Sequence, residues 1–352
     1  MGLKKFWNGR KVFISGITGF KGSWLSAWLN VLGAEVKGYS LIPEDENSLF
    51  YLLNINKCCS TIFGDVRDEE YLLKAIDEFK PEVIFHLAAQ PLVQESYSNP
   101  KETYEINLMG TINMLESALK CNSVKSFVNV TSDKVYENKE WEWGYRENER
   151  LNGSDPYSNS KSCADLIASC YKKSFLQDNF KLANVRSGNV IGGGDWAKDR
   201  LIPDMIRAQL KNEVMVLRNP KSTRPWQHVL EPLYGYLLVA QRMLEEGGFD
   251  TDWNFGPDHT EDASVEKIAE SYNAFWSTEA QVATKPDAYK EAKYLRLDSS
   301  KANNLLGWKS IWNLKDTLQK TFIWYDAFLK ELDMKKVTLD QINEYQEMQE
   351  KR

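Results

Sequence analysis

The stretch KVFISGITGFKGSWLSAWLNVL, residues 11–32, contains the pattern that decides the fold. Its first five residues, Lys11–Ser15, form a short apolar run of strand length, and Gly22–Leu32 continues with the spacing of a helix. Three glycines at the spacing G-x-x-G-x-x-G lie between the two segments. Glycines placed there let the backbone turn tightly and approach a pyrophosphate at the N-terminus of the helix. The stretch therefore predicts a strand, a turn and a helix that together bind a dinucleotide.

Outward from this stretch, the chain alternates strand-like and helix-like segments. Further strands are expected over residues 35–40, 59–63, 83–88, 124–130 and 182–186, and helices over residues 69–79, 100–120 and 158–176. This alternation, with nearly continuous apolar strands, is typical of a parallel sheet that is covered by helices on both faces. We therefore expect an α/β protein of the doubly wound Rossmann class.

The character of the chain changes after residue 188, where loops rich in glycine, proline and tryptophan join shorter helices. We expect a smaller, mostly helical substrate-binding lobe over the carboxyl edge of the sheet, where ligands bind in such folds. The dinucleotide-binding domain then comprises residues 1–187 and 225–258, including a returning helix over 229–244. The smaller lobe comprises residues 188–224 and 259–352. It ends in an amphipathic helix over 338–350, which Thr338 and Gln341 are expected to open at capping-box spacing.

Composition excludes several classes of protein. The 352 residues carry a net charge of −6 without a basic tract, which disfavours nucleic acid as a partner. No apolar run approaches the ~20 residues of a membrane span, and Met1–Trp7 is expected to open a strand rather than a signal peptide. Five cysteines, with Cys58 and Cys59 adjacent, suit reduced thiols and a cytoplasmic protein. Three histidines, at 86, 228 and 259, are too scattered to predict a metal site.

The glycine spacing resembles that of the extended short-chain dehydrogenases/reductases. The resemblance implies that Gly64-Asp65-Val66 contacts adenine and that Leu87-Ala88-Ala89 passes beside the ribose and nicotinamide. The cofactor-binding residues are then Gly16, Thr18, Gly19, Phe20, Lys21, Gly22, Asp65, Val66, Leu87, Ala88 and Ala89, together with Tyr157 and Lys161.

The choice between NAD and NADP depends on the segment after the second strand. A carboxylate that binds the ribose 2′-hydroxyl is usual about 20 residues after the glycines, and Gly38–Leu41 contains none. However, no lysine or arginine lies between residues 38 and 56 to hold a 2′-phosphate, and Glu44–Glu46 is acidic. The sequence therefore favours NAD.

Tyr157 and Lys161, at i and i+4, are expected to share one face of a helix. A lysine cation there would lower the pKa of the phenol from its reference of ~10. The same spacing recurs at Tyr97/Lys101 and Tyr289/Lys293, so spacing alone does not select the pair. Context does, because only Tyr157 follows the fifth strand, 25 residues beyond Ser132. The other two pairs are interpreted as surface pairs.

The fifth strand is expected to end in Val130-Thr131-Ser132-Asp133-Lys134 at the carboxyl edge of the sheet. A solvated turn would have the same composition. The alternative is that Ser132 hydrogen-bonds the substrate hydroxyl, while Asp133 and Lys134 form a second acid–base pair that a plain alcohol dehydrogenase does not need.

At this point the chain resembles the CDP-glucose 4,6-dehydratases. The shared blocks, which extend from residue 12 to about 257, are GITGFKGSWLSAWL, HLAAQPLVQESY, VTSDKVYEN, DPYSNSK, GNVIGGGDWAKDRLIPD, TRPWQHVLEPLYGYL and NFGP. The sister TDP-glucose dehydratases carry a glutamate where this chain has Lys134. The chain departs from the pattern at Val135, where cysteine is expected. Beyond residue 260 no block is distinctive.

The resemblance implies a redox-neutral removal of water from CDP-glucose that gives CDP-4-keto-6-deoxy-glucose. Tyr157 takes the proton of the 4-hydroxyl, Lys134 removes the C5 proton, and Asp133 protonates the departing 6-hydroxyl. Asn189 and Arg224 contact the diphosphate. Position alone adds Gln90, Arg200 and His228 as substrate-binding candidates, and His228 is equally compatible with a structural role. Trp196 and Trp226 could stack on the base or belong to the core.

Two other functions stay open at this stage. A nucleotide-sugar 4-epimerase would use Ser132, Tyr157 and Lys161 without the Asp133–Lys134 pair. A non-catalytic NAD-binding protein could dispense with Tyr157 and Lys161. The superfamily also pairs subunits through two helices each, so a homodimer or homotetramer is expected through residues 100–120 and 158–176. Ile106, Met109, Leu115, Leu166 and Cys170 are the apolar residues expected on these helices.

Overall fold

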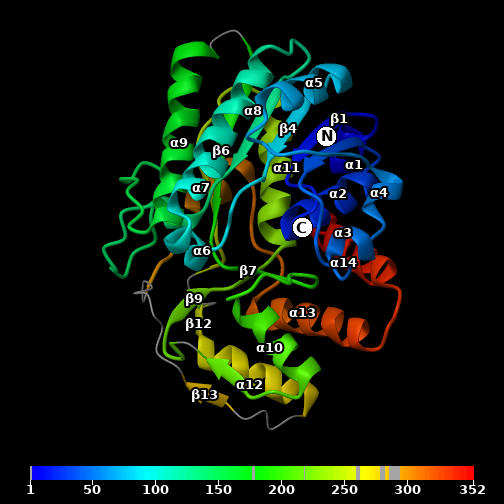
Figure 1. The fold of residues 1–352 in the computed structure, drawn as a ribbon, viewed down its shortest axis with the longest axis vertical. Helices are drawn as coiled ribbons and strands as arrows, with labels where there is room; N and C mark the ends of the chain where they lie inside the picture. Colours follow the sequence, from blue (N-terminus) through cyan, green and yellow to red (C-terminus); the bar gives the residue numbers. More distant parts are fainter. Residues whose placement is uncertain (1, 177–178, 218, 259–261, 278–281, 285–293) are drawn as a thin grey trace.

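The computed structural model describes residues 2–176, 179–217, 219–258, 262–277, 282–284 and 294–352. A seven-stranded sheet, parallel throughout, forms the centre of the larger lobe (Figure 1). Its spatial order is β11 (Trp253–Phe255), β6 (Lys181–Ser187), β5 (Ser126–Val130), β4 (Val83–His86), β1 (Lys11–Ser15), β2 (Glu35–Ser40) and β3 (Ser60–Phe63). The predicted doubly wound Rossmann class is confirmed, because the strand order reverses beside β1.

Helices cover both faces of this sheet and bury a separate apolar core on each. One face carries α5 (Glu69–Phe79), α7 (Pro100–Tyr104), the π-helical turn η1 (Glu105–Met109), α8 (Gly110–Leu119) and α9 (Pro156–Phe175). The other carries α1 (Leu3–Trp7), α2 (Phe20–Val31), α3 (Leu49–Leu52), α4 (Ile55–Cys58) and α11 (Leu230–Glu245). Because residues 3–7 are helical, the strand expected over Met1–Trp7 is wrong.

The smaller lobe lies beyond the carboxyl edge of the sheet (Figure 1). Its described elements are α10 (Leu201–Lys211), β8 (Met215–Leu217), β9 (Thr223–Pro225), β12 (Asp262–Ser264), α12 (Val265–Trp276), β13 (Val282–Thr284) and α13 (Leu314–Leu329). Two short strands, β7 (Val190–Ile191) and β10 (Gln227–His228), pair between the lobes. His259 lies outside the described residues.

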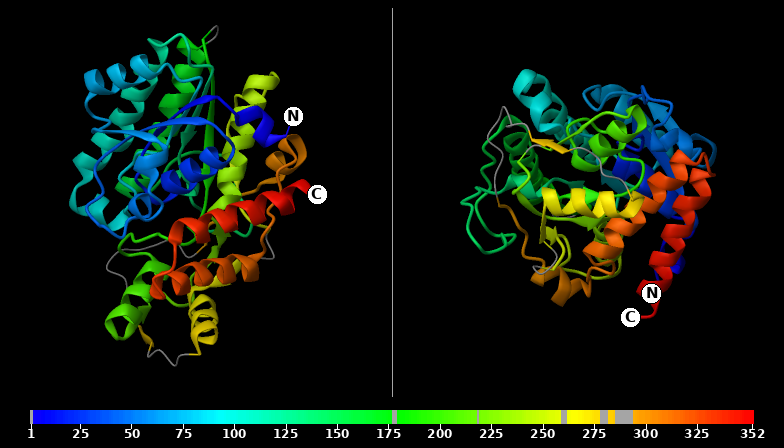
Figure 2. Two further views of the ribbon diagram at one scale, coloured as in Figure 1. Left: turned by 90° about the vertical axis from the view of Figure 1, so that its right-hand side faces the viewer. Right: turned by 90° about the horizontal axis from the view of Figure 1, so that it is seen from below.

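The last helix, α14 (Met334–Glu350), packs against both α13 and α2 (Figure 2). It begins one turn before the predicted capping box, and Asp333 is its N-cap. Thr338 and Gln341 are buried inside it, where Thr338 accepts a hydrogen bond from Trp324 and Gln341 donates one to the Lys320 carbonyl. The capping-box prediction is therefore wrong, because the polar atoms of both side chains bind another helix.

Among the residues that the structure describes, no helix combines the length and the apolar composition that crossing a bilayer requires.

Candidate active site

A cleft of about 850 Å³ lies along the carboxyl edge of the sheet, between the two lobes. It collects the predicted site residues from eight separate segments of the chain. Those that line it are Gly16, Thr18, Gly19, Phe20, Lys21, Gly22, Asp65, Val66, Leu87, Ala88, Ala89, Gln90, Ser132, Asp133, Lys134, Tyr157, Lys161, Asn189, Arg200 and Arg224. His228 is the one predicted site residue that does not line it.

The glycine turn at one end of the cleft leaves no room for side chains. Gly16 has φ +76°, and a Cβ there would lie 2.7 Å from the amide nitrogen of Ala88. A Cβ on Gly22 would lie 2.1 Å from the Gly16 carbonyl oxygen. Gly19, the N-cap of α2, has no side chain to bind the first amides of that helix. The turn therefore fits a dinucleotide pyrophosphate, which would take those N–H donors at close range.

At the adenosine end, the predicted acid is already paired. The Asp65 carboxylate accepts bonds from Arg67 at 2.7 and 3.0 Å, and the arginine holds the pKa of Asp65 below its usual range. The second strand ends without a carboxylate, as expected. Instead, the hydroxyls of Thr18 and Ser40 lie 2.6 Å apart, and Thr18 donates to the Leu41 carbonyl. A ribose there would meet hydroxyl groups rather than an acid.

Ser132 and Asp133 are buried together at the end of β5. The Ser132 hydroxyl caps the short turn η2 (Asp133–Val135), where it accepts from the Lys134 amide and donates to Asp133 Oδ1 at 3.1 Å. Burial raises the pKa of the Asp133 carboxyl. Lys134, Ser132 and Arg224 act to lower this pKa, but the effect of burial is larger. The carboxyl of Asp133 therefore holds its proton more tightly than that of a solvent-exposed aspartate.

Tyr157 and Lys161 lie on α9, facing that same edge. Burial raises the pKa of the Tyr157 phenol, although its hydrogen bond to Ser132 acts against the shift. Burial also lowers the pKa of Lys161 to about 8, and its Nζ donates to the Val130 carbonyl at 2.9 Å. The pKa of the Tyr157 phenol is therefore raised, not lowered as expected, and the groups that oppose the rise are Ser132 and Arg200 rather than Lys161.

A second lysine reaches the catalytic edge from the glycine turn. Lys21 Nζ donates to Ser187 Oγ at 2.7 Å and to Tyr236 Oη at 3.3 Å. Burial, followed by the charge of Arg200, lowers its pKa to about 7. The motif placed Lys21 in the cofactor turn, but no pattern in the sequence indicated Ser187 or Tyr236 beside it.

The substrate-side candidates differ in how their side chains are occupied. Arg200 pairs with Asp195 at 2.7 Å, whereas Arg224 is buried and donates to the neighbouring Thr223 carbonyl. The Gln90 amide donates to Leu92 and Thr103, and its oxygen accepts from the Leu92 amide. Gln90 therefore lines the cleft with an amide that local contacts already use.

His228 belongs to the core. It is fully buried, with its ring 5.6 Å from the Trp24 ring and 4.7 Å from the Trp312 ring. Burial lowers its pKa to about 3. Its proximity to Arg224 in sequence misled the prediction, because β10 turns the side chain away from the cleft. Trp196 likewise packs on Tyr325, while Trp226 does line the cleft.

Comparison with known proteins agrees with this geometry. The family described as GDP-mannose 4,6 dehydratase matches residues 13–321. CDP-glucose 4,6-dehydratase of Salmonella typhimurium is 50% identical over 350 residues, covering 97% of this chain and 98% of that protein.

Solved structures share the fold at low identity. A dTDP-glucose 4,6-dehydratase from Streptomyces venezuelae, solved with NAD, has a TM-score of 0.80 and 20% identity over 92% of this chain and 99% of its own. A UDP-glucose 4-epimerase from Thermotoga maritima also has a TM-score of 0.80 and 20% identity, over 91% and 99% of the two chains. Fold alone does not separate dehydratase from epimerase. The length of the family match and the 50% identity show that the chain belongs to the GDP-mannose 4,6 dehydratase family and is similar to CDP-glucose 4,6-dehydratase.

Proposed function

We propose that the protein catalyses the NAD-dependent removal of water from CDP-glucose, giving CDP-4-keto-6-deoxy-glucose for deoxysugar biosynthesis. One observation carries this choice of reaction. Asp133 and Lys134 line the cleft beside Ser132, Tyr157 and Lys161, which supplies a second acid–base pair next to the first. A 4-epimerase needs only the first pair, so the second favours elimination.

Each side chain then has one task. Tyr157 Oη takes the proton of the substrate 4-hydroxyl, and Ser132 holds that hydroxyl in place. Lys134 Nζ takes the C5 proton once C4 is a ketone, and a proton returns to C5 after water has left. Asp133, whose carboxyl pKa is raised by burial, gives its proton to the departing 6-oxygen. NAD, bound at the glycine turn, would accept a hydride and later return it.

The smaller lobe would hold the nucleotide. Arg224 and Asn189 line the cleft on that side, and a guanidinium offers a forked set of donors to a diphosphate. Cytidine is favoured over other bases by the relative that is 50% identical and named for CDP-glucose. We also propose a cytoplasmic homodimer or homotetramer.

A panel of nucleotide-glucoses tests the reaction. CDP-glucose, incubated with the protein and NAD, should lose one water, as measured by mass spectrometry. An unchanged mass with an inverted C4 would instead identify an epimerase. Loss of water only from another nucleotide-glucose would overturn the choice of cytidine but not the choice of reaction.

Titration tests the cofactor. NAD should bind more tightly than NADP, because no basic residue between 38 and 56 can hold a 2′-phosphate. With hydroxyls rather than a carboxylate at the end of β2, activity should also depend on added NAD. Equal affinities, or protein purified already saturated with NAD, would contradict these expectations.

A further inference from the structure

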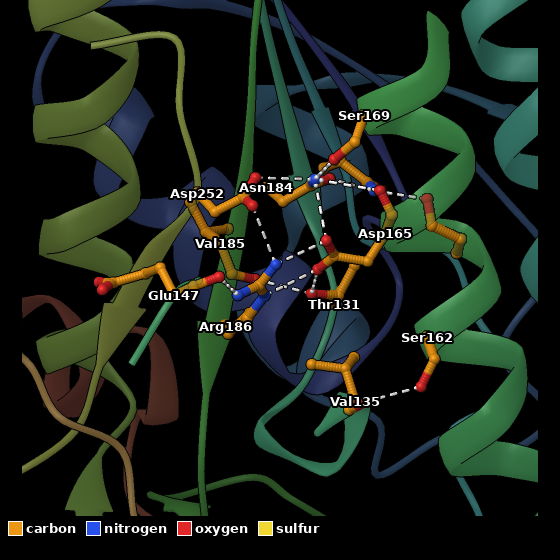
Figure 3. Close-up of polar contacts among 12 residues, drawn as sticks. Thr131, Val135, Glu147, Ser162, Asp165, Ser169, Asn184, Val185, Arg186 and Asp252 are labelled. Carbon is orange, nitrogen blue, oxygen red and sulfur yellow. Dashed lines mark hydrogen bonds and ion pairs between the residues drawn. The ribbon is translucent and has the colours of Figure 1, made fainter. Parts of the chain in front are cut away.

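A buried ion pair lies behind the catalytic edge, outside the chemistry assigned so far (Figure 3). Arg186 is an interior residue of β6 and Asp165 lies on α9; their side chains are 1% and 0% exposed. The guanidinium donates to both carboxylate oxygens, with Nε 2.9 Å from Oδ2 and Nη2 2.7 Å from Oδ1. This is the bidentate geometry that fixes two groups in orientation as well as in distance.

The Asp165 carboxylate receives two further hydrogen bonds, one from β6 and one from the residue that follows β5. Thr131, the residue directly after β5, donates its hydroxyl to Oδ2 at 2.9 Å. Asn184, on β6, donates to Oδ1 at 3.0 Å. Four donors, three from β6 and one from the residue after β5, therefore converge on one carboxylate of α9, as Figure 3 shows.

This carboxylate lies at the centre of the contact that sets the catalytic geometry. Lys161 is one helical turn before Asp165, and Ser132 follows Thr131 in the chain. Two more bonds join the same elements: Lys161 Nζ to the Val130 carbonyl at 2.9 Å, and Ser162 Oγ to the Val135 carbonyl at 2.8 Å. Sliding or rotating α9 against β5 would break all of these contacts together.

Stability alone does not explain a buried pair of this kind. Taking two charges out of water costs several kcal/mol, and well-packed apolar residues of similar volume often stabilise a fold as well or better. We propose that Asp165, held by Arg186 and Thr131, is a positioning residue that sets the separation between the Tyr157–Lys161 face of α9 and the Ser132 edge of β5. The proposal rests on the proposed function only for the choice of assay.

The charge of Asp165 also acts on Lys161. Burial lowers the pKa of Lys161 to about 8, and the Asp165 carboxylate opposes that shift. Further charged or titratable groups surround Asp165, Arg186 and Lys161. They are His86 on β4, Lys21 on α2, Tyr136 after η2, Glu147 before α9, Asp252 before β11 and Lys301 before η4 (Ala302–Leu306). Removing only the Asp165 charge should let the Lys161 pKa fall further.

Substitutions of Thr131 and Asp165 separate position from charge. Thr131→Val keeps the shape but removes the bond to Asp165, so kcat should fall on the order of 10-fold to 100-fold with KM little changed. Thr131→Ser keeps the hydroxyl and should restore most of kcat. Asp165→Asn keeps the volume and removes the charge, so the alkaline limb of the pH profile of kcat/KM should move to lower pH. In Thr131→Val that limb should stay in place.

Glu231→Gln is the matched control, since it also changes a buried, hydrogen-bonded carboxylate, but at the start of α11. It should lower stability while leaving kcat and the pH profile unchanged. Wild-type kcat in Thr131→Val, or an unmoved limb in folded Asp165→Asn, would overturn the proposal. If Asp165→Asn does not fold, the comparison of kcat in Thr131→Val and Thr131→Ser still tests the proposal. If the wild type acts on another nucleotide-glucose, the variants are assayed with that substrate. A wrong choice of substrate in the proposed function can then be told apart from a failure of the positioning role.

Discussion

At the scale of single residues, two different side chains at the catalytic edge are proposed to take the two substrate protons. Tyr157 lies on α9, whereas Lys134 lies on the turn after β5, adjacent to Asp133. Replacing Lys134 with alanine should therefore leave oxidation at C4 possible and block elimination, with a rate loss of ~10²–10⁴-fold in water release. On addition of CDP-glucose, NADH absorbance should accumulate, and exchange of the C5 proton with deuterated solvent should nearly stop.

Tyr157→Phe is the control for that experiment, because it removes the acceptor of the first proton. It should prevent NADH formation altogether, so the two variants differ in kind rather than in degree. If Lys134→Ala exchanged the C5 proton and lost water at the wild-type rate, the elimination base would have to be another residue.

The glycine turn gives a second prediction at this scale. In Gly22→Ala the new methyl would lie 2.1 Å from the Gly16 carbonyl oxygen, so α2 has to move away from the turn. Crowding of this kind costs about 1–3 kcal/mol, or roughly 5-fold to 150-fold in NAD affinity if the whole cost falls on binding. Calorimetric titration with NAD measures the change.

Gly247→Ala provides the comparison, since a Cβ there meets nothing within 4 Å. Its NAD affinity should equal that of the wild type. Equal affinity in Gly22→Ala as well would mean that the turn is not where the pyrophosphate binds.

At the scale of elements, one buried carboxylate joins the C-terminal part of the chain to α11. Glu231, at the start of α11, accepts bonds from the amides of Ile311 and Trp312 and from the Tyr345 hydroxyl on α14. Burial raises its pKa from 4.5 to about 7 in spite of these donors. The folded protein therefore binds this proton more tightly than the unfolded chain.

The sign of the resulting pH dependence follows directly. Between pH 4.5 and about 7 the folded state holds more protons, so this group makes stability fall as pH rises through that window and then level off. In Glu231→Gln that part of the slope should disappear. Urea unfolding of both proteins across the window measures it, and equal slopes would show that Glu231 does not titrate there.

Much of the secondary structure was predictable from the sequence, because local residue patterns determine where these strands and helices form. The ends of the six expected strands lie within one residue of their predicted positions, except that β4 ends two residues early and β5 begins two residues late. Long-range contacts account for the failures. The strand β11 has only three residues, too few for a pattern, and it exists through its pairing with β6. Thr338 looked like a helix cap because the sequence cannot show its bond to Trp324.

The same reasoning applies to the site. Residues inside one motif, such as Tyr157 and Lys161, were predictable because a helix brings i and i+4 together. Arg186 and Asp165 were not, because only the pairing of α9 with β6 brings an interior strand residue to a distant carboxylate. His228 failed for the converse reason, since proximity in sequence to Arg224 does not decide which way a strand points its side chains.

At the scale of the whole molecule, α9 offers an exposed apolar face for assembly. Leu166 is 53% exposed, and Cys170 follows on the same face, while Met109 on η1 is also exposed. Leu115 on α8 is buried in the core and therefore belongs to the face that meets the sheet. Leu166→Arg should therefore convert a dimer or tetramer toward monomers, as measured by light scattering.

Leu305→Arg is the matched control, because Leu305 is 59% exposed on η4, away from α7, α8 and α9. Its assembly should match the wild type. A wild-type protein that stays monomeric at micromolar concentration would contradict the expected oligomer.

The position of β11 has a consequence for how the chain is made. During synthesis β6 leaves the ribosome before the segment that forms α10, and β11 follows only after α11. Until then the nascent sheet exposes the unpaired backbone edge of β6, a template on which other chains can pair. Until then Arg186 also lacks its hydrogen bond to Asp252, which lies directly before β11. A chain released before residue 255 would therefore keep an open sheet edge along β6. The charge of Arg186 would also be only partly neutralised. Such truncated products should aggregate rather than fold.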